Sequence, residues 1–83
     1  MTESEYDIIT RIIEVYDEYL DAEITSDEFE EKLDTLNGRL SSDSDISNTV
    51  AIYIRSSIWE ASSLNGEISK IEEDRNTLED LLE

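Results

Sequence analysis

The chain contains neither cysteine nor histidine. Without cysteine it forms no disulfide, carries no thiolate nucleophile and offers no sulfur ligand for a metal. Without histidine it lacks the commonest general base and the commonest metal-binding side chain. Its apolar runs are far shorter than a membrane span, and its first residues do not have the pattern of a secretory signal peptide. We therefore expect a cytoplasmic protein that is not an enzyme, with no catalytic residues, no cofactor and no metal site.

Proline is absent and glycine is limited to Gly38 and Gly66, so nothing in the sequence prevents long helices. A length of 83 residues predicts one domain, residues 1–83. A chain of this size buries only about 60–65% of its unfolded surface, and its core is small. Acid–base catalysis needs a carboxyl group with a raised pKa in an apolar pocket beside one that stays ionised. A small core among many solvent-facing acids offers no such pair.

Basic residues are scarce: six Lys and Arg stand against 23 Asp and Glu, and the net charge is −17. Nucleic acids and anionic membranes are bound through Lys and Arg, so we expect no direct contact with either. A basic protein surface is the favourable partner. Disorder is disfavoured because 37% of the residues are hydrophobic and well phased. A role in solubility alone, as in a salt-adapted cytosol, stays open and agrees with the presence of only two lysines, Lys32 and Lys70.

The first half of the chain predicts two amphipathic helices. From about Ser4 to Ala22, Ile, Val and Tyr recur on one helical face. Thr25-Ser26-Asp27-Glu28 is then a capping box, with Ile24 before it and Phe29 after it as a hydrophobic staple. The second helix keeps its apolar phase to Leu40. The short connection between the two helices predicts an antiparallel hairpin.

The second half permits two architectures. The segment Ile46–Ser63 contains strand formers at Val50–Ile54, but its length and phase favour a helix. A four–three apolar rhythm continues from Val50 to Leu82, interrupted by Arg75, and favours one long helix. The poor helix formers in Ser62–Gly66 favour a break. We expect an all-α bundle of four helices; the alternative is a helical hairpin plus one long C-terminal helix.

The acids of the first half form like-charge pairs four residues apart. These pairs are Glu14–Glu18, Asp17–Asp21, Asp27–Glu31 and Glu30–Asp34. Each costs a helix roughly 0.2–0.5 kcal/mol, and only Asp7–Arg11 and Glu28–Lys32 offset them locally. Rows of carboxylates on exposed helices imitate the regular negative charge of a nucleic-acid backbone. We therefore predict a partner-binding surface, made of Glu14, Asp17, Glu18, Asp21, Asp27, Glu30, Glu31 and Asp34.

Three aromatic residues carry further expectations. Tyr16 and Tyr19 fall on the apolar face of the first helix and are expected at the edge of the core, with their hydroxyls in water. Trp59 lies one position off the apolar stripe, beside Glu60. Two interpretations of Trp59 remain open: a partly buried surface residue, or an anchor for a protein interface.

The stretch Tyr19–Glu31 resembles the first helix–turn–helix of colicin D-type immunity proteins. Those proteins are small acidic four-helix bundles that block a tRNA-cleaving toxin by presenting acids to its basic cleft. The resemblance implicates Asp27, Glu30 and Glu31. In composition and size the chain also resembles phage-encoded nucleic-acid mimics, including anti-CRISPR and anti-restriction proteins. Both resemblances imply an inhibitor that occupies the nucleic-acid site of a nuclease or phage-defence complex.

The competing hypothesis is a structural or adaptor protein. The rhythm from Val50 to Leu82 is typical of a coiled-coil seam that builds a dimer or docks a partner helix. Arg75 is then either a polar register device or a side chain that extends to solvent at the bundle end. On this hypothesis the acids serve only solubility. A monomer favours the inhibitor, which we prefer, and a tight homodimer favours the structural protein.

Overall fold

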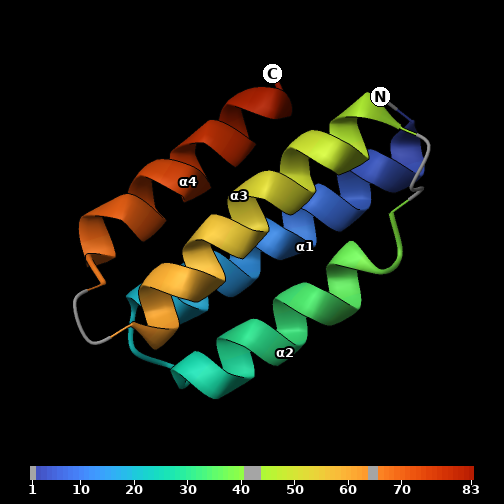
Figure 1. Cartoon of the computed structure of the whole chain (residues 1–83). Helices are drawn as coiled ribbons and strands as arrows, with labels where there is room; N and C mark the ends of the chain where they lie inside the picture. Colours follow the sequence, from blue (N-terminus) through green and yellow to red (C-terminus); the bar gives the residue numbers. More distant parts are fainter. Residues whose placement is uncertain (1, 41–43, 64–65) are drawn as a thin grey trace.

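The computed structural model describes residues 2–40, 44–63 and 66–83. The helices of these segments are α1 (Glu3–Leu20), α2 (Ser26–Asn37), α3 (Asp45–Ser62) and α4 (Ile68–Leu81). Successive helices run in opposite directions, and both chain ends lie at the same end of the bundle (Figure 1). The helices form a ring in which α1 and α3 each pack against both α2 and α4. The predicted all-α four-helix bundle is confirmed.

The alternative of one long C-terminal helix is wrong. Helix α3 ends at Ser62 and α4 begins at Ile68, while Asn65, part of the expected break, lies outside the described residues. Across the break, the Glu60 carboxylate accepts a hydrogen bond from the backbone N–H of Glu67 at 2.8 Å. A Cβ at Gly66 would lie 1.7 Å from the Glu60 carbonyl oxygen. Only glycine permits this close approach, so Gly66 allows the turn that follows α3.

Helix starts follow the sequence signals closely. The predicted capping box of α2 is confirmed: Thr25 accepts the Glu28 N–H at 3.2 Å, and the Glu28 carboxylate accepts the Thr25 N–H at 3.1 Å. Thr2 caps α1 and forms the same reciprocal pair with Glu5 at 2.9 and 3.1 Å. Ser44 caps α3. The strand-forming residues Val50–Ile54 lie within α3, so the prediction of a helix from the length and phase of this segment is confirmed.

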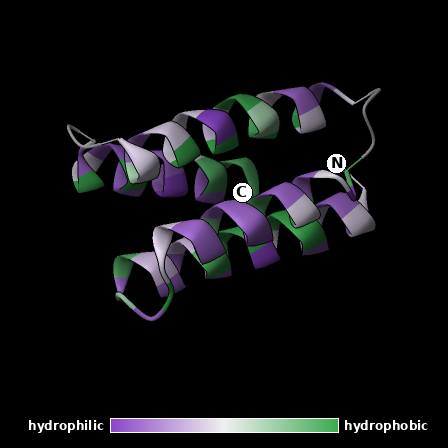
Figure 2. Cartoon of the chain, turned by 60° about the horizontal axis from the view of Figure 1, so that its bottom comes forward, coloured by the Kyte–Doolittle hydropathy of each residue, from purple (hydrophilic) through white to green (hydrophobic). Residues whose placement is uncertain are grey.

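The apolar stripes of all four helices meet inside the ring (Figure 2). The buried hydrophobic residues are Ile9, Ile12, Ile13, Val15, Tyr16, Phe29, Leu33, Leu36, Leu40, Val50, Ile54, Ile71 and Leu78. The last four belong to the rhythm that suggested a coiled-coil seam. Because these four side chains are buried within the bundle, that seam is not free to pair with another helix.

A series of hydrogen bonds crosses this core, and the expectation that Tyr16 lies at the core edge with its hydroxyl in water is wrong. The Tyr16 side chain is fully buried, and its hydroxyl lies 2.6 Å from the Ser57 hydroxyl. Ser57, also fully buried, donates to the Asp74 carboxylate at 2.8 Å. A buried hydroxyl without a partner would lose its hydrogen bonds to water, and Ser57 supplies that partner from the apolar stripe of α3. These two hydrogen bonds link α1, α3 and α4.

Candidate functional site

The turn between α1 and α2 fixes the predicted hairpin. Ala22 adopts a left-handed conformation, with φ of 60°. Its N–H donates to the Tyr19 carbonyl at 3.0 Å, and the Glu23 N–H donates to the Glu18 carbonyl at 2.8 Å. These two bonds satisfy carbonyls at the end of α1 in the manner of a Schellman motif. The chain therefore leaves α1 in a defined direction and enters α2 through its capping box.

Aromatic packing holds the two helices of the hairpin together. Phe29 is fully buried, with its ring edge-on to Tyr16 at a centroid distance of 5.2 Å. The Tyr19 ring stacks on Phe29 at 4.4 Å. Aromatic pairs of these two geometries each contribute about 0.5–1.5 kcal/mol beyond the area they bury. Ile24, the other member of the predicted staple, packs partly buried against the same core.

Four of the predicted site residues project from the outer side of α2. Asp27, Glu30, Glu31 and Asp34 are all exposed, whereas the core residues of the helix point the other way. Among the described residues, no Lys or Arg lies within ion-pairing distance of these four carboxylates. We call this set the α2 acid row. It is a line of unpaired negative charge on a helix held rigidly by its cap and core.

A shallow groove of about 420 Å³ runs between α1 and α2. Val15 and Leu36 are its apolar residues, and its rim brings together Glu14 and Glu18 with Glu31 of the α2 acid row. Its remaining lining residues are Arg11, Glu28, Lys32 and Thr35. The groove therefore carries four carboxylates against two cations, and its charge is mixed rather than uniformly acidic.

The cations of this region do not pair as the sequence suggested. Lys32 lies 3.5 Å from the Glu18 carboxylate on α1, and within the described chain neither Glu28–Lys32 nor Asp7–Arg11 forms an ion pair. Glu28 is instead engaged by the capping box. The bridge between Lys32 and Glu18 joins the two helices and relieves part of the repulsion between Glu14 and Glu18. Both of its side chains are well exposed, so its contribution to stability is small.

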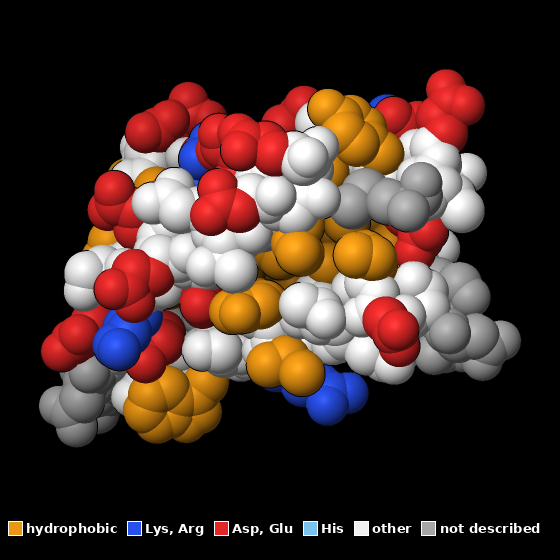
Figure 3. All heavy atoms as spheres, turned by 90° about the horizontal axis from the view of Figure 1, so that it is seen from above, with side chains coloured by type: hydrophobic (Ala, Val, Ile, Leu, Met, Phe, Trp, Pro, Cys, Tyr) orange, Lys and Arg blue, Asp and Glu red, His pale blue; other side chains and the backbone are white. Residues whose placement is uncertain are grey.

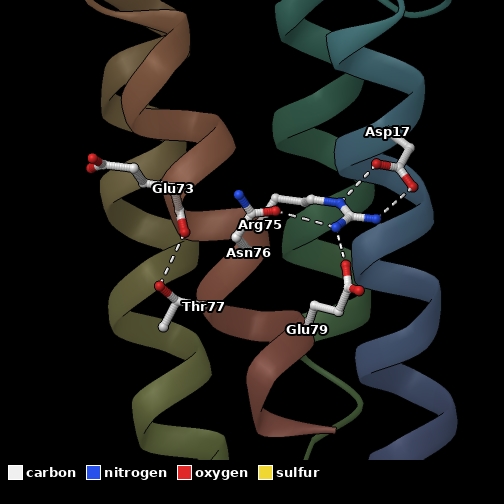
Figure 4. Close-up of polar contacts among 6 residues, drawn as sticks. All are labelled: Asp17, Glu73, Arg75, Asn76, Thr77 and Glu79. Carbon is white, nitrogen blue, oxygen red and sulfur yellow. Dashed lines mark hydrogen bonds and ion pairs between the residues drawn. The ribbon is translucent and has the colours of Figure 1, made fainter. Parts of the chain in front are cut away.

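Asp17 and Asp21 lie on a different side of α1, beside α4, where they line a groove of about 360 Å³. There Arg75 of α4 donates two hydrogen bonds to the Asp17 carboxylate, from Nε at 2.9 Å and from Nη2 at 3.4 Å (Figure 4). The same guanidinium also contacts Asn76 and Glu79. The Asp17 hydrogen bond is the main reason that the pKa of Arg75 is raised. Arg75 is thus a cross-helix partner of Asp17 and is only 24% exposed.

The eight predicted acids therefore do not form one surface. Glu14 and Glu18 face the α1–α2 groove, and Asp17 and Asp21 face α4. The remaining four form the α2 acid row. Spacing along α1 could not reveal this division because it depends on which neighbouring helix covers each flank. The Asp17–Arg75 pair was not predicted, because Arg75 was expected to set a coiled-coil register or to extend to solvent. The position of this polar residue in an apolar stripe was the signal that it needed a partner.

The outer side of α3 differs from the acidic surfaces. Ile52 and Trp59 are 65% and 62% exposed. The helix carries only Asp45 and Glu60 against Arg55, a net charge of −1. Figure 3, which views the bundle from above, shows acidic side chains and exposed hydrophobic side chains next to one another on that side of the molecule. Of the two interpretations of Trp59, its exposure favours the interface anchor.

Searches of known families, curated proteins and solved structures found no match to this chain. None of the four described helices is long and apolar enough to cross a membrane. Within residues 2–40, 44–63 and 66–83, no group of three or more acids is arranged to hold a metal ion. The surface chemistry of the bundle is therefore the basis for assigning a function.

Proposed function

We propose that this protein is a non-enzymatic inhibitor that presents an acidic helical surface to the basic cleft of a nucleic-acid-binding protein. The target class is a nuclease or a phage-defence complex, as in toxin immunity, anti-CRISPR or anti-restriction systems. The observation that carries the proposal is the α2 acid row: four exposed carboxylates without a cation among the described residues. Such a surface attracts Lys and Arg from a partner.

The spacing of the α2 acid row suits a mimic of nucleic acid. Asp27 and Asp34 are seven residues apart, which corresponds to a rise of about 10.5 Å along the helix. Four charges over that length give one charge every ~3.5 Å. One strand of duplex DNA carries one charge per ~3.4 Å of helix axis. A cleft whose basic residues are spaced for a phosphate backbone therefore meets charges at a similar density on α2.

The energetics of the hairpin also support a binding role for α2. The pairs Asp27–Glu31 and Glu30–Asp34 each cost roughly 0.2–0.5 kcal/mol of helix stability, and no described cation offsets them. On α1 the corresponding repulsion is relieved by bridges to Lys32 and Arg75. A basic partner would supply charge-assisted hydrogen bonds to the acids of α2, together with fast, salt-sensitive association. We therefore assign the primary contact to the α2 acid row and a flanking role to Glu14 and Glu18.

The resemblance to colicin D-type immunity proteins points to the same helix. Asp27, Glu30 and Glu31, the residues that it implicates, all belong to the α2 acid row. A four-helix bundle is also the fold that this resemblance implies, and it is the fold of this chain. These agreements favour an inhibitor of the immunity type over a protein whose acids serve only solubility.

Competition for nucleic acid tests the proposal. The protein is immobilised, basic nucleic-acid-binding proteins are captured from a lysate, and each is purified and loaded with labelled DNA or RNA. The expected result is that the wild-type protein displaces the labelled nucleic acid from its target. A variant with Asp27→Asn, Glu30→Gln, Glu31→Gln and Asp34→Asn should keep its helical circular dichroism but lose displacement. A target that holds nucleic acid and this protein at the same time would contradict the proposal.

A further inference from the structure

The outer face of α3 carries two large hydrophobic side chains in register. Ile52 and Trp59 are seven residues apart, which is about two helical turns, so they project from the same side of the helix. Both are more than half exposed. Ser56 lies between them and is small enough to permit the close approach of another helix. The core of the bundle lies on the opposite side of α3, where Val50 and Ile54 are buried.

Charge distinguishes this face from the rest of the molecule. Helix α3 has a net charge of −1, whereas α1 has six acids against Arg11, α2 has five against Lys32, and α4 has five against Lys70 and Arg75. Helices α1 and α3 occupy opposite corners of the ring (Figure 1). Two copies that meet through α3 therefore keep their most acidic helices farthest apart. A basic partner, in contrast, is attracted to the other three helices.

We propose that two copies of this chain associate through α3, packed parallel about a two-fold axis, with Ile52 and Trp59 against their counterparts. This is the arrangement of a short coiled-coil contact, in which residues flanking the apolar positions form bridges between the helices. In a parallel pair, a flanking residue meets the residue five positions later on the other helix. Arg55 and Glu60 have this spacing. Two-fold symmetry then gives the Arg55–Glu60 pair twice.

The Arg55–Glu60 spacing is the complementarity that selects a second copy over an unrelated apolar partner. Within the described residues Arg55 has no ion-pair partner, so its guanidinium is available. Glu60 is partly exposed and is held by its hydrogen bond from the N–H of Glu67. The contact area of one exposed helix face is below the ~800 Å² per partner of a standard interface. The dimer is therefore weak, with a dissociation constant on the order of 0.1 mM.

The dimer has a salt dependence opposite to that of target binding. Both copies carry a charge of −17, so added salt screens their repulsion and strengthens association through an apolar contact. The binding of a basic cleft by the α2 acid row weakens with salt for the same reason. The dimer does not depend on the function proposed above, and the acids of α2 lie on the exposed side of their own helix, outside the α3 contact. The two proposals can therefore fail separately.

Sedimentation equilibrium combined with tryptophan fluorescence tests the dimer, because Trp59 is the only tryptophan in the chain. As the concentration of the wild-type protein rises toward about 1 mM in 1 M salt, we expect a growing dimer fraction and a blue shift of the emission. Trp59→Ala should weaken association at least about tenfold, as expected for a central aromatic anchor. Tyr6→Ala removes an exposed aromatic residue from α1 and is the matched control. It should leave association unchanged.

The ion pair tests the orientation. Measured at about 0.15 M salt, where a direct ion pair is screened less than at 1 M, Arg55→Glu alone should weaken the dimer several-fold, and adding Glu60→Arg to the same chain should restore it. Circular dichroism checks that each variant is folded. A protein that stays monomeric at about 1 mM in 1 M salt overturns the proposal. So does a dimer that Trp59→Ala leaves intact, and so does a dimer that Arg55→Glu does not weaken.

Discussion

The two halves of this bundle are held together in different ways. In the α1–α2 hairpin, both helices begin with a capping box, α1 ends in a Schellman motif, and three aromatic rings pack in sequence. In the α3–α4 half, the N-cap of α4 is Glu67, which makes no side-chain capping bond within the described chain. There the contacts join residues far apart in sequence: the Tyr16–Ser57–Asp74 chain and the Asp17–Arg75 pair.

This difference between the two halves determines where the protein tolerates charge. The α1–α2 hairpin has strong local determinants, so it can keep a row of mutually repelling acids on α2 without losing its structure. Helix α4 has weaker local determinants, and it depends on polar contacts with α1 and α3. The most acidic surface of the molecule thus lies on the half that is best defined by its own sequence, which is where a rigid binding surface is most useful.

Removing the Phe29 side chain at the centre of the hairpin should have the largest effect on the free energy of unfolding. Phe29 is fully buried between Tyr16 and Tyr19, so Phe29→Ala should lower the free energy of unfolding by about 3–5 kcal/mol. Phe29→Leu keeps most of the volume and should cost clearly less. Urea denaturation measures both. A loss below about 1 kcal/mol for Phe29→Ala would mean that the aromatic cluster does not hold the hairpin.

The two glycines lie in different halves of the bundle, and replacing them with alanine should change the stability in opposite directions. A Cβ at Gly66 meets the Glu60 carbonyl at 1.7 Å, so Gly66→Ala must shift the α3–α4 turn and should destabilise the protein by about 1–3 kcal/mol. A Cβ at Gly38 meets its nearest atom at 3.4 Å, and the backbone there is helical. Gly38→Ala should therefore stabilise the protein by about 0.4–1 kcal/mol. Thermal melts of the two variants measure these changes. Shifts of the melting temperature in the same direction would contradict the prediction.

The polar chain of the second half should respond to pH. Burial raises the pKa of Asp74 although Ser57 donates a hydrogen bond to it. The folded state then binds a proton more readily than the unfolded state, so stability should rise as pH falls from neutrality through the raised pKa. Asp74→Asn should reduce this rise, which is measured by melts between about pH 7 and pH 4. An unchanged pH profile in the variant would exclude Asp74 as its source. Asp74 is only partly buried, so solvent limits the size of the effect.

The smallest expected effect is at the turn of the hairpin. Ala22 holds a left-handed conformation that is unfavourable for a residue with a Cβ. Ala22→Gly removes this cost but increases the freedom of the unfolded chain, so the net gain should be about 0.5–1 kcal/mol. Melting experiments would show it as a small rise in melting temperature. A destabilised variant would mean that the turn is not the strained point of the hairpin.

Local sequence signals were sufficient for the first half of the fold. The α2 capping box, its staple and the apolar phase each depend on residues within a few positions of one another, and the helix starts at the predicted place. The same reasoning left the second half open between two architectures. The break lies where the poor helix formers favoured it, but the close approach of Gly66 to Glu60 is a contact that helical periodicity does not encode.

The candidate site could be predicted only in part. Exposure of the four acids on α2 follows from their phase relative to Phe29 and Leu33. The pairing of Asp17 with Arg75 and of Glu18 with Lys32 does not follow, because both pairs join different helices. The burial of Tyr16 was also missed, since its partner Ser57 lies 41 residues away. Charge patterns along one helix therefore identify exposed acids, but the three-dimensional arrangement determines which of them remain unpaired.

Two variants of equal net charge test most directly whether the α2 acid row is the binding surface. One carries amides throughout the α2 acid row; the other carries Glu72→Gln, Glu73→Gln, Asp80→Asn and Glu83→Gln, which alter exposed acids on or after α4. Both change the net charge by the same amount, and calorimetric titration against the purified target measures their affinities. If the α2 acid row is the binding surface, the α2 variant should bind at least about a hundredfold more weakly than the α4 variant. Equal affinities would show that only the total charge matters, and would contradict the assignment of binding to α2.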